Sequence, residues 1–118
     1  MINKDKTKPV YMIGVVADIL GVHPQTLRLY EREGFICPVR QNKQRIYSDE
    51  DIERLNFILE LTRDLGVNRA GVEIVLRLHK RLGLVRQEMD EMMTFLDDED
   101  IKMRFREKLA DILEKEEI

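Results

Sequence analysis

Apolar residues near the start of the chain recur with the spacing of two short helices. The first apolar stripe consists of Ile13, Val16, Ala17 and Leu20. Gly21 interrupts this stripe, and Pro24 then stands at a first helical position, with His23 before it as the N-cap. The second helix runs on to Gly34, which ends it. Two short helices joined by a turn that contains a glycine predict a helix-turn-helix.

The next segment, FICPVRQNKQRIYS over residues 35–48, favours strands. Its strand-forming residues are Phe35, Ile36, Val39, Ile46 and Tyr47. Between these clusters stands Gln41-Asn42-Lys43, and asparagine tolerates a left-handed turn conformation. The pattern therefore predicts a small β-hairpin directly after the helix-turn-helix, in the position of a wing.

Two amphipathic helices are predicted after the hairpin. The first is capped by Ser48 or Asp49 and ends at Gly66. Its apolar face consists of Ile52, Leu55, Ile58, Leu59 and Thr62. The second is capped by Asn68, and its apolar residues are Val72, Val75, Leu76, Leu78 and Leu82. These helices would support the helix-turn-helix from behind.

From Leu82 onward the apolar spacing changes to that of a coiled coil. Steps of three and four residues join the members of a seam: Leu82, Val85, Met89, Met92 and Leu96. An acidic run at 97–100 interrupts it, and Asp97 or Asp98 would cap a last helix. The apolar stripe of that helix consists of Ile101, Phe105, Leu109 and Ile112. Because the seam spans only two heptads, residues 101–118 would complete a dimer interface; the alternative is that the seam folds back on the domain.

These elements together predict an all-α fold class with a small β wing: a winged helix-turn-helix followed by a helical dimerisation segment. Residues 1–10 are polar and lysine-rich, and they are expected to form a flexible lead. Residues 11–82 would form the winged domain, and residues 83–118 the helices that dimerise.

The charge of the chain is unevenly distributed. The net charge is −3, which by itself argues against binding to phosphate. However, residues 1–47 contain eight lysines and arginines against four acids, whereas residues 48–118 carry a net charge of −7. A basic N-terminal part on an acidic body is what one DNA-facing surface would require, although a chance distribution of surface charge is the simpler alternative.

In a winged helix-turn-helix the second helix enters the major groove of DNA. Its exposed face is predicted to present Gln25, Thr26, Arg28, Leu29 and Arg32. Glutamine pairs with adenine and arginine with guanine, so Gln25 and Arg28 are the candidate base readers, and Thr26 could bond a phosphate. The alternative is that these are ordinary solvated positions of an exposed helix.

The predicted wing is basic. Arg40, Lys43 and Arg45 lie within six residues, and no acid occurs between Glu33 and Asp49. These cations are suited to phosphate contacts, which fix the register of a protein on DNA. Tyr47 could also donate its hydroxyl to a phosphate, or it could lie buried beneath the wing.

Other functional classes find little support in the residues. Cys37 is the only cysteine, and His23 and His79 lie far apart, so no metal site and no cofactor is expected. No phosphate loop, nucleophile or carboxylate pair indicates an enzyme, and no catalytic residue is assigned. No segment is apolar enough for a membrane span, no secretory signal is recognised and no membrane partner is expected, so a cytoplasmic location is expected. No evident pocket for a small-molecule effector is expected either.

The stretch from Met12 to Leu82 resembles the DNA-binding domain of the MerR family of transcriptional regulators. The matching segments are IGVVADILGVHPQTLRLYEREGFICPVR, QRIYSDEDIERL and LGVNRAGVEIVLRL, and HPQTLRLYEREGFI with RIYS is most similar to the heat-shock repressor (HspR) type. The resemblance implies DNA contacts by Thr26, Arg28, Tyr30, Arg45 and Tyr47. It also implies that Gln25 faces DNA.

The resemblance also implies a partner and a role. Family members pair through a helix after the DNA-binding domain, so a homodimer on double-stranded DNA with an inverted-repeat operator is expected. The implied function is a repressor of stress or chaperone genes, with the chaperone DnaK as a possible co-repressor. The alternative is a MerR-like module that binds a chaperone or co-chaperone and not DNA, which the acidic body would suit.

Overall fold

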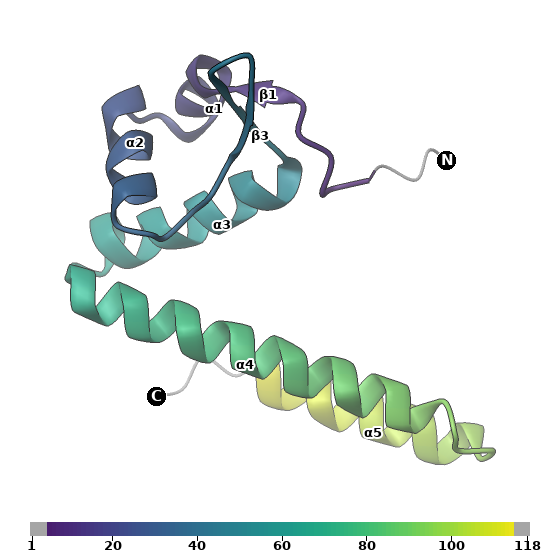
Figure 1. Ribbon diagram of the computed structural model, residues 1–118. Helices are drawn as coiled ribbons and strands as arrows, with labels where there is room; N and C mark the ends of the chain where they lie inside the picture. Colours follow the sequence, from purple (N-terminus) through teal and green to yellow (C-terminus); the bar gives the residue numbers. More distant parts are fainter. Residues whose placement is uncertain (1–4, 115–118) are drawn as a thin grey trace. The chain divides into compact units, whose positions relative to one another are not determined.

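The computed structural model describes residues 5–114, and its first two helices form a helix-turn-helix (Figure 1). Helices α1 (Ile13–Leu20) and α2 (Pro24–Arg32) confirm the two predicted helices. Gly21 ends α1 in the left-handed conformation, with φ of 68°. The His23 ring caps α2, because its Nδ1 accepts a hydrogen bond of 3.0 Å from the Gln25 backbone N–H. Both junctions follow from local residue chemistry.

A three-stranded antiparallel sheet accompanies these helices. The strands β1 (Tyr11–Met12), β2 (Val39–Gln41) and β3 (Gln44–Tyr47) lie in the order β1-β3-β2. The predicted hairpin is confirmed as β2 and β3, and its turn places Asn42 and Lys43 at φ of 50° and 65°. Two consecutive positive φ values are those of a type I′ hairpin turn. Strand β1 was not predicted, because two residues are too short to show a periodic pattern.

Two residues predicted to lie in a strand lie outside the sheet. Phe35 and Ile36 belong to the connection between α2 and β2, and both are almost fully buried. The Phe35 carbonyl accepts a hydrogen bond of 2.6 Å from Arg54 Nε, which gives this buried connection a polar partner. Their apolar character therefore reflects burial in the core and not pairing with another strand.

Helix α3 (Asp49–Leu59) starts with the predicted cap. Ser48 Oγ accepts a hydrogen bond from the Asp51 N–H at 3.1 Å, and the Asp51 carboxylate accepts one from the Ser48 N–H at 3.0 Å. This reciprocal pair is a capping box. The helix continues as a π-helical segment, η1 (Glu60–Asp64), which the regular apolar spacing did not predict. Within this segment the Thr62 hydroxyl donates a hydrogen bond of 2.9 Å to the Ile58 carbonyl. A side chain of this kind competes with the backbone N–H groups for a carbonyl of the helix.

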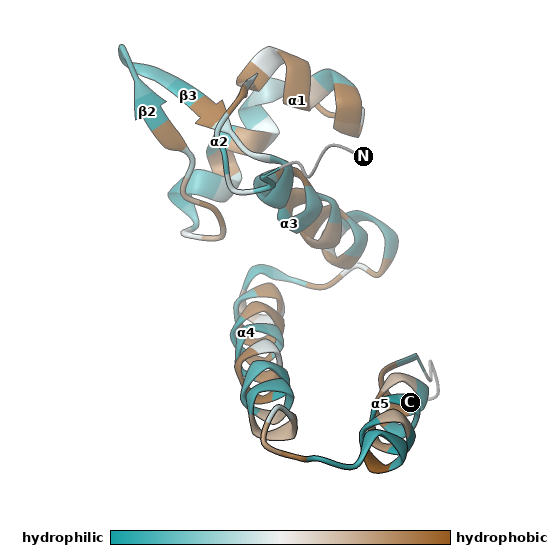
Figure 2. Ribbon diagram, turned by 90° about the vertical axis from the view of Figure 1, so that its right-hand side faces the viewer, coloured by the Kyte–Doolittle hydropathy of each residue, from teal (hydrophilic) through white to brown (hydrophobic). Residues whose placement is uncertain are grey.

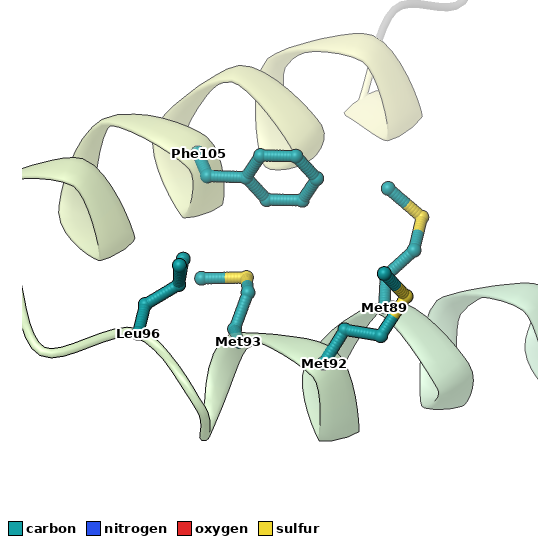
Figure 3. Close-up of a pocket in the computed structure, with 5 residues that line it drawn as sticks. All are labelled: Met89, Met92, Met93, Leu96 and Phe105. Carbon is teal, nitrogen blue, oxygen red and sulfur yellow. The ribbon is translucent and has the colours of Figure 1, made fainter.

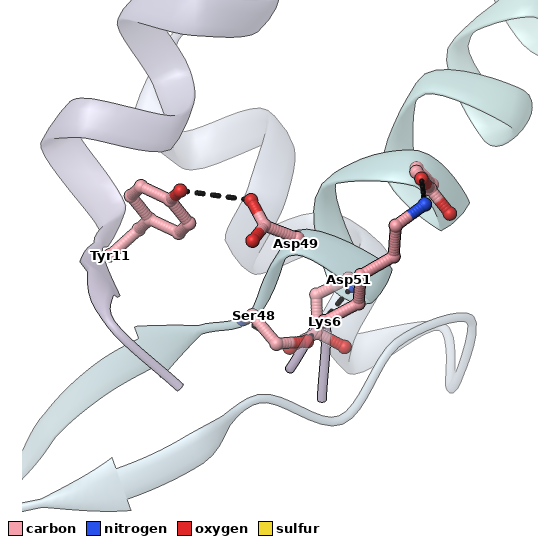
Figure 4. A network of polar contacts seen from close by, with 6 residues as sticks. Lys6, Tyr11, Ser48, Asp49 and Asp51 are labelled. Atoms are coloured by element: carbon pink, nitrogen blue, oxygen red, sulfur yellow. Dashed lines mark hydrogen bonds and ion pairs between the residues drawn. The ribbon is translucent and has the colours of Figure 1, made fainter. Parts of the chain in front are cut away.

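Residues 5–10, which belong to the predicted flexible lead, contact α3 and β3, and Figure 4 shows Lys6 beside the start of α3. The Lys6 ammonium pairs with Glu53 at 3.0 Å, and the Lys6 carbonyl accepts a hydrogen bond from the Glu50 N–H. The Val10 N–H donates to the Tyr47 carbonyl and so extends the pairing between β1 and β3. Helix α3 therefore supplies both the Glu53 carboxylate and the Glu50 N–H that hold the segment, and the Glu50 N–H is one of the first-turn donors that have no partner within the helix. Residues 1–4 of that predicted lead lie outside the described residues.

The core of the winged domain lies between the helix-turn-helix, the sheet and the helices that follow. Its buried members are Val16, Ala17, Leu27, Tyr30, Phe35, Ile36, Tyr47, Leu55, Ile58, Leu59, Leu61, Val72 and Leu76. The last two belong to α4 (Arg69–Met93), whose Asn68 side chain accepts a hydrogen bond from the Gly71 N–H as predicted. The predicted apolar faces of both supporting helices therefore contribute to one core.

We expect the Ile58→Val variant to be less stable than the wild type by about 1 kcal/mol, because it removes one methylene from a fully buried side chain. Urea unfolding followed by circular dichroism measures this difference. Ile74→Val is the matched control, since Ile74 is 54% exposed and its truncation should change stability by much less. Equal effects of the two substitutions would contradict the placement of the core.

The chain divides into two compact units between Arg77 and Leu78. This division lies within α4, as does the predicted domain boundary after Leu82. In the second unit α5 (Glu99–Glu114) starts at the predicted cap, where Asp98 accepts hydrogen bonds from the Asp100 and Ile101 N–H groups. None of the residues described in α5 is buried. This unit therefore has little core of its own.

The helical seam is shorter than predicted. Helix α4 ends at Met93, so Leu96 lies in the connection to α5 and not on the seam helix. The backbone N–H groups of Thr94, Phe95 and Leu96 bond to carbonyls three residues earlier, which tightens the chain at the helix end. The Thr94 hydroxyl also donates to the Glu91 carbonyl at 2.6 Å. The acidic run that follows can then cap α5.

Candidate nucleic-acid interface

Helix α2 presents the polar face that the sequence predicts for a recognition helix. Its inner side is held by Leu27 and Tyr30, both buried. On the other side Gln25 and Arg32 are exposed, and Thr26 and Arg28 are half-buried. Figure 2 shows that the hairpin of β2 and β3 is hydrophilic toward its tip, which extends away from the helices. The structure thus leaves the four predicted polar residues of α2 accessible.

The two tyrosines among the candidate DNA-contacting residues lie in the core. Tyr47 is fully buried, and Tyr30 is 8% exposed with its hydroxyl 3.1 Å from Thr62 Oγ1. Burial raises the pKa of the Tyr47 hydroxyl, which stays neutral, and within the described residues that hydroxyl has no hydrogen-bond partner. The burial of both rings therefore argues against direct DNA contacts by these tyrosines. Tyr47 instead takes the alternative placement beneath the wing.

The wing, residues 39–47, is joined to α2 by one carboxylate. Glu31 Oε2 lies 2.9 Å from Arg40 Nη2, and Glu31 Oε1 lies 2.6 Å from Arg45 Nε. Arg40 and Arg45 are also direct partners in the register of β2 and β3. Like charges directly opposite each other destabilise a sheet, so the carboxylate between them compensates their repulsion. Arg40 and Arg45 are therefore not simply free cations of the wing.

Glu31 should make this attachment sensitive to acid. Burial raises the pKa of the Glu31 carboxyl, but the hydrogen bonds from Arg45 and Arg40 outweigh burial and hold the pKa below its usual value. A group with a lowered folded pKa stabilises the fold fully above its unfolded pKa, and this stabilisation is lost as the pH falls through the folded value. The stability advantage of the wild type over Glu31→Gln should therefore shrink in acid. Urea unfolding of both proteins across the acidic range measures it, and an advantage that is constant with pH would contradict this assignment.

A basic pocket lies where α2, the wing and the start of α1 meet. It is a concavity of about 200 Å³ lined by Met12, Ile13, Arg28, Lys43, Gln44 and Arg45. Its lining contains three cationic side chains and no carboxylate. Helix α1 begins at this pocket, and its N-cap residue Met12 forms no side-chain hydrogen bond to the first turn. Cations beside the amide end of a helix are suited to hold a phosphate group.

Four residues of this interface were not singled out from the sequence. Met12, Ile13 and Gln44 line the basic pocket through the unpredicted strand β1 and the exact hairpin register. Glu31 could have been found from the hairpin pattern, because a turn at Asn42 and Lys43 places two arginines opposite each other and calls for a nearby acid. Arg32, in contrast, does not line the basic pocket, although it remains exposed on α2.

Four of the five predicted dimerisation residues are exposed apolar side chains in the second unit. Leu82, Val85 and Met92 are each more than half exposed, and Leu96 is 39% exposed. Met89, Met92, Met93, Leu96 and Phe105 line an apolar cavity of about 290 Å³ (Figure 3). Figure 3 shows Phe105 of α5 extending toward the methionines of α4. The sequence pattern did not predict this cavity, because the connection after α4 and the first turns of α5 bring its lining residues together only in the folded chain.

Neither a candidate metal-binding group nor a helix that could span a membrane occurs within residues 5–114. Within that range no group of three or more histidine, cysteine, aspartate or glutamate residues could hold a metal ion, and Cys37 is exposed. No helix there is long and apolar enough to cross a membrane.

The family model described as MerR HTH family regulatory protein matches residues 11–79. The heat shock protein HspR of Streptomyces coelicolor is 39% identical over 84% of this chain, and the match spans 66% of that relative. GlnR of Bacillus anthracis is 32% identical over 60% of this chain and 55% of its own length. The chain thus spans less than two thirds of these relatives.

Two solved structures share the fold. The lead-bound transcription regulator PbrR691 of Ralstonia metallidurans is 23% identical with a TM-score of 0.55, covering 89% of this chain and 82% of that one. HiNmlR, a MerR family regulator solved on promoter DNA, is 22% identical with a TM-score of 0.53, covering 86% and 89%. They agree with the predicted fold class, and the matched family is one of regulators and not of enzymes. This chain belongs to the MerR HTH family of regulatory proteins.

Proposed function

We propose that this MerR-family regulator is a dimeric repressor of stress or chaperone genes that binds an inverted-repeat operator. The basic pocket carries the proposal, because it joins cations of the recognition helix and the wing at the start of α1. A phosphate seated there would place the exposed side of α2 against the major groove. Gln25 and Arg28 would read base edges. Lys43 would contact the DNA backbone. The remaining predicted contact residues would support this docking: Thr26, Arg32, Arg40 and Arg45.

Two further observations support the regulatory role and the dimer. The similarity to HspR over 84% of the chain favours stress or chaperone genes as targets. The exposed apolar seam on α4, with Leu82, Val85 and Met92, is a surface that a second copy would cover. A two-fold dimer presents two recognition helices, which is why an inverted repeat is the expected operator. The chaperone DnaK would act as a protein co-repressor. Adding purified DnaK to an operator-binding reaction tests this role, and we expect it to increase the affinity for the operator.

A selection of binding sites from random double-stranded DNA tests the proposal. We expect an enriched inverted repeat whose affinity falls steeply with salt, because phosphate contacts release counterions. The spacing of the half-sites gives the separation of the two recognition helices in the dimer. Enrichment of no sequence would contradict the proposal.

A second candidate function follows from the acidic part of the chain. Residues 48–118 carry a net charge of −7, which suits a module that binds a chaperone or co-chaperone and not DNA. The accessible cations of the basic pocket argue against this candidate. A stoichiometric complex with a purified chaperone, together with no shift of any duplex in a gel, would favour it.

A further inference from the structure

An acid stands among the cations of the recognition helix. Glu31 is on α2 between Arg28 and Arg32, on the helix that is proposed to face DNA. A carboxylate close to a DNA backbone is repelled by phosphate, so it lowers affinity unless it is neutralised. Glu31 is neutralised within the protein by Arg40 and Arg45. The position of Glu31 therefore indicates a role within the protein and not a contact with DNA.

The contacts of Glu31 join two elements through separate oxygen atoms. Oε1 accepts from Arg45 Nε and Oε2 from Arg40 Nη2, so each strand of the wing is held once. The side chain of Glu31 is 23% exposed and that of Arg45 is 24% exposed, which limits competition by water. Within residues 5–114 these are the side-chain hydrogen bonds found between the wing and the rest of its domain.

The held arginine also faces the basic pocket. Arg45 lines that pocket with Arg28 and Lys43, so the bond to Glu31 fixes one wall of the pocket relative to α2. Arg28 lies three residues before Glu31 on the same helix, and the two side chains therefore emerge from neighbouring turns. A rotation of the wing about its ends would open the pocket and change the distance between Lys43 and Arg28.

We propose that Glu31 is a positioning residue that locks the wing onto the recognition helix and favours specific over non-specific DNA binding. This inference rests on the proposed function. The carboxylate partly neutralises two arginines and so weakens their electrostatic attraction to the phosphates of any duplex. The same carboxylate holds the wing and α2 in one fixed arrangement, which only the correct operator matches at every contact. The affinity for non-specific duplexes is therefore lowered, whereas the affinity for the operator is maintained by the preorganised surface.

Glu31→Gln tests this role in the full chain, with Glu33→Gln as the matched control. Both substitutions remove one negative charge from the same end of α2, but Glu33 pairs with Arg69 of α4 and not with the wing. Any difference between the two variants therefore reports the attachment of the wing and not net charge. If Glu31→Gln does not fold, Glu31→Asp replaces it, because its shorter side chain cannot reach both arginines.

The first measurement needs no DNA. Nuclear magnetic resonance relaxation of the backbone amides of residues 39–47 reports how firmly the wing is held. We expect lower order parameters in this range for Glu31→Gln, and values like those of the wild type for Glu33→Gln. The Arg45 Nε–H signal should also move toward that of a solvated arginine in Glu31→Gln alone. An unchanged wing in Glu31→Gln would overturn the positioning role.

The second measurement compares a selected operator with a scrambled duplex of equal length. For Glu31→Gln we expect the ratio of the two affinities to fall about tenfold, with the scrambled duplex bound as tightly as before or more tightly. Glu33→Gln should keep the ratio within about twofold of the wild type. Equal ratios for both variants would overturn the specificity role. If the wild type itself has no preferred duplex, the proposed function fails, while the amide relaxation still decides whether Glu31 holds the wing.

Discussion

Arg28→Ala is expected to weaken binding to the selected operator by roughly tenfold to a hundredfold, the equivalent of about 1–3 kcal/mol for a lost bidentate base contact. Arg28 lines the basic pocket and emerges from the accessible side of α2. Its guanidinium can therefore approach a guanine edge while Lys43 contacts the neighbouring backbone. Fluorescence anisotropy with the operator and with single-base variants of it measures the loss and assigns the base that is read.

The comparison with a scrambled duplex separates base reading from charge. If Arg28 reads a base, the operator loses far more affinity than the scrambled duplex; if it contacts a phosphate, both weaken alike. Arg63→Ala is the matched control, because Arg63 is exposed in the same unit but does not line the basic pocket. A loss as large for Arg63→Ala as for Arg28→Ala would contradict the location of the interface.

The double variant Leu82→Glu/Val85→Glu is expected to be monomeric and to bind the operator at least a hundredfold more weakly. Both side chains are more than half exposed on α4, where a second copy is proposed to cover them. Four carboxylates in the dimer seam would be buried without partners, which is strongly unfavourable. A monomer engages one half-site at a time and so loses the effective concentration that two linked sites provide.

Sedimentation velocity and gel shift on the operator measure the two consequences together. Leu84→Glu/Arg86→Glu is the matched control, since these exposed positions adjoin the seam residues but are not members of it. It should remain dimeric and bind with an affinity close to that of the wild type. Dimerisation of the Leu82→Glu/Val85→Glu protein would mean that a different surface joins the two copies.

Local signals in the sequence predicted most of the fold, because the groups that satisfy them lie within a few residues. His23, Ser48, Asn68 and Asp98 cap their helices through bonds to N–H groups two or three positions later. The hairpin turn at Asn42 follows in the same way from backbone conformation. Such contacts need no knowledge of the rest of the chain, so a pattern of residue types identifies them.

The candidate site was predicted less completely. The recognition helix and the basic wing were found because their polar and apolar positions alternate with the period of each element. The same residue types, however, gave no means to tell an exposed tyrosine from a buried one, and Tyr30 and Tyr47 lie in the core. The pattern also grouped Arg40, Lys43 and Arg45 together as cations suited to phosphate contacts, and it did not predict that Glu31 pairs with Arg40 and Arg45.

What the sequence determined by itself is the order of helices and hairpin, their capped ends and the separation of a basic part from an acidic one. The tertiary structure decided which distant residues come into contact: the pairing of β1 with β3, the joining of the wing to α2 through Glu31, and the lining of the basic pocket. The physical reason is the separation along the chain of the residues that interact. A cap or a turn is satisfied by neighbours along the chain, whereas a bond between residue 31 and residue 45 depends on how two elements pack. The distinction matters for the proposed function, because Glu31 already pairs with two of the cations that the sequence predicts to contact DNA.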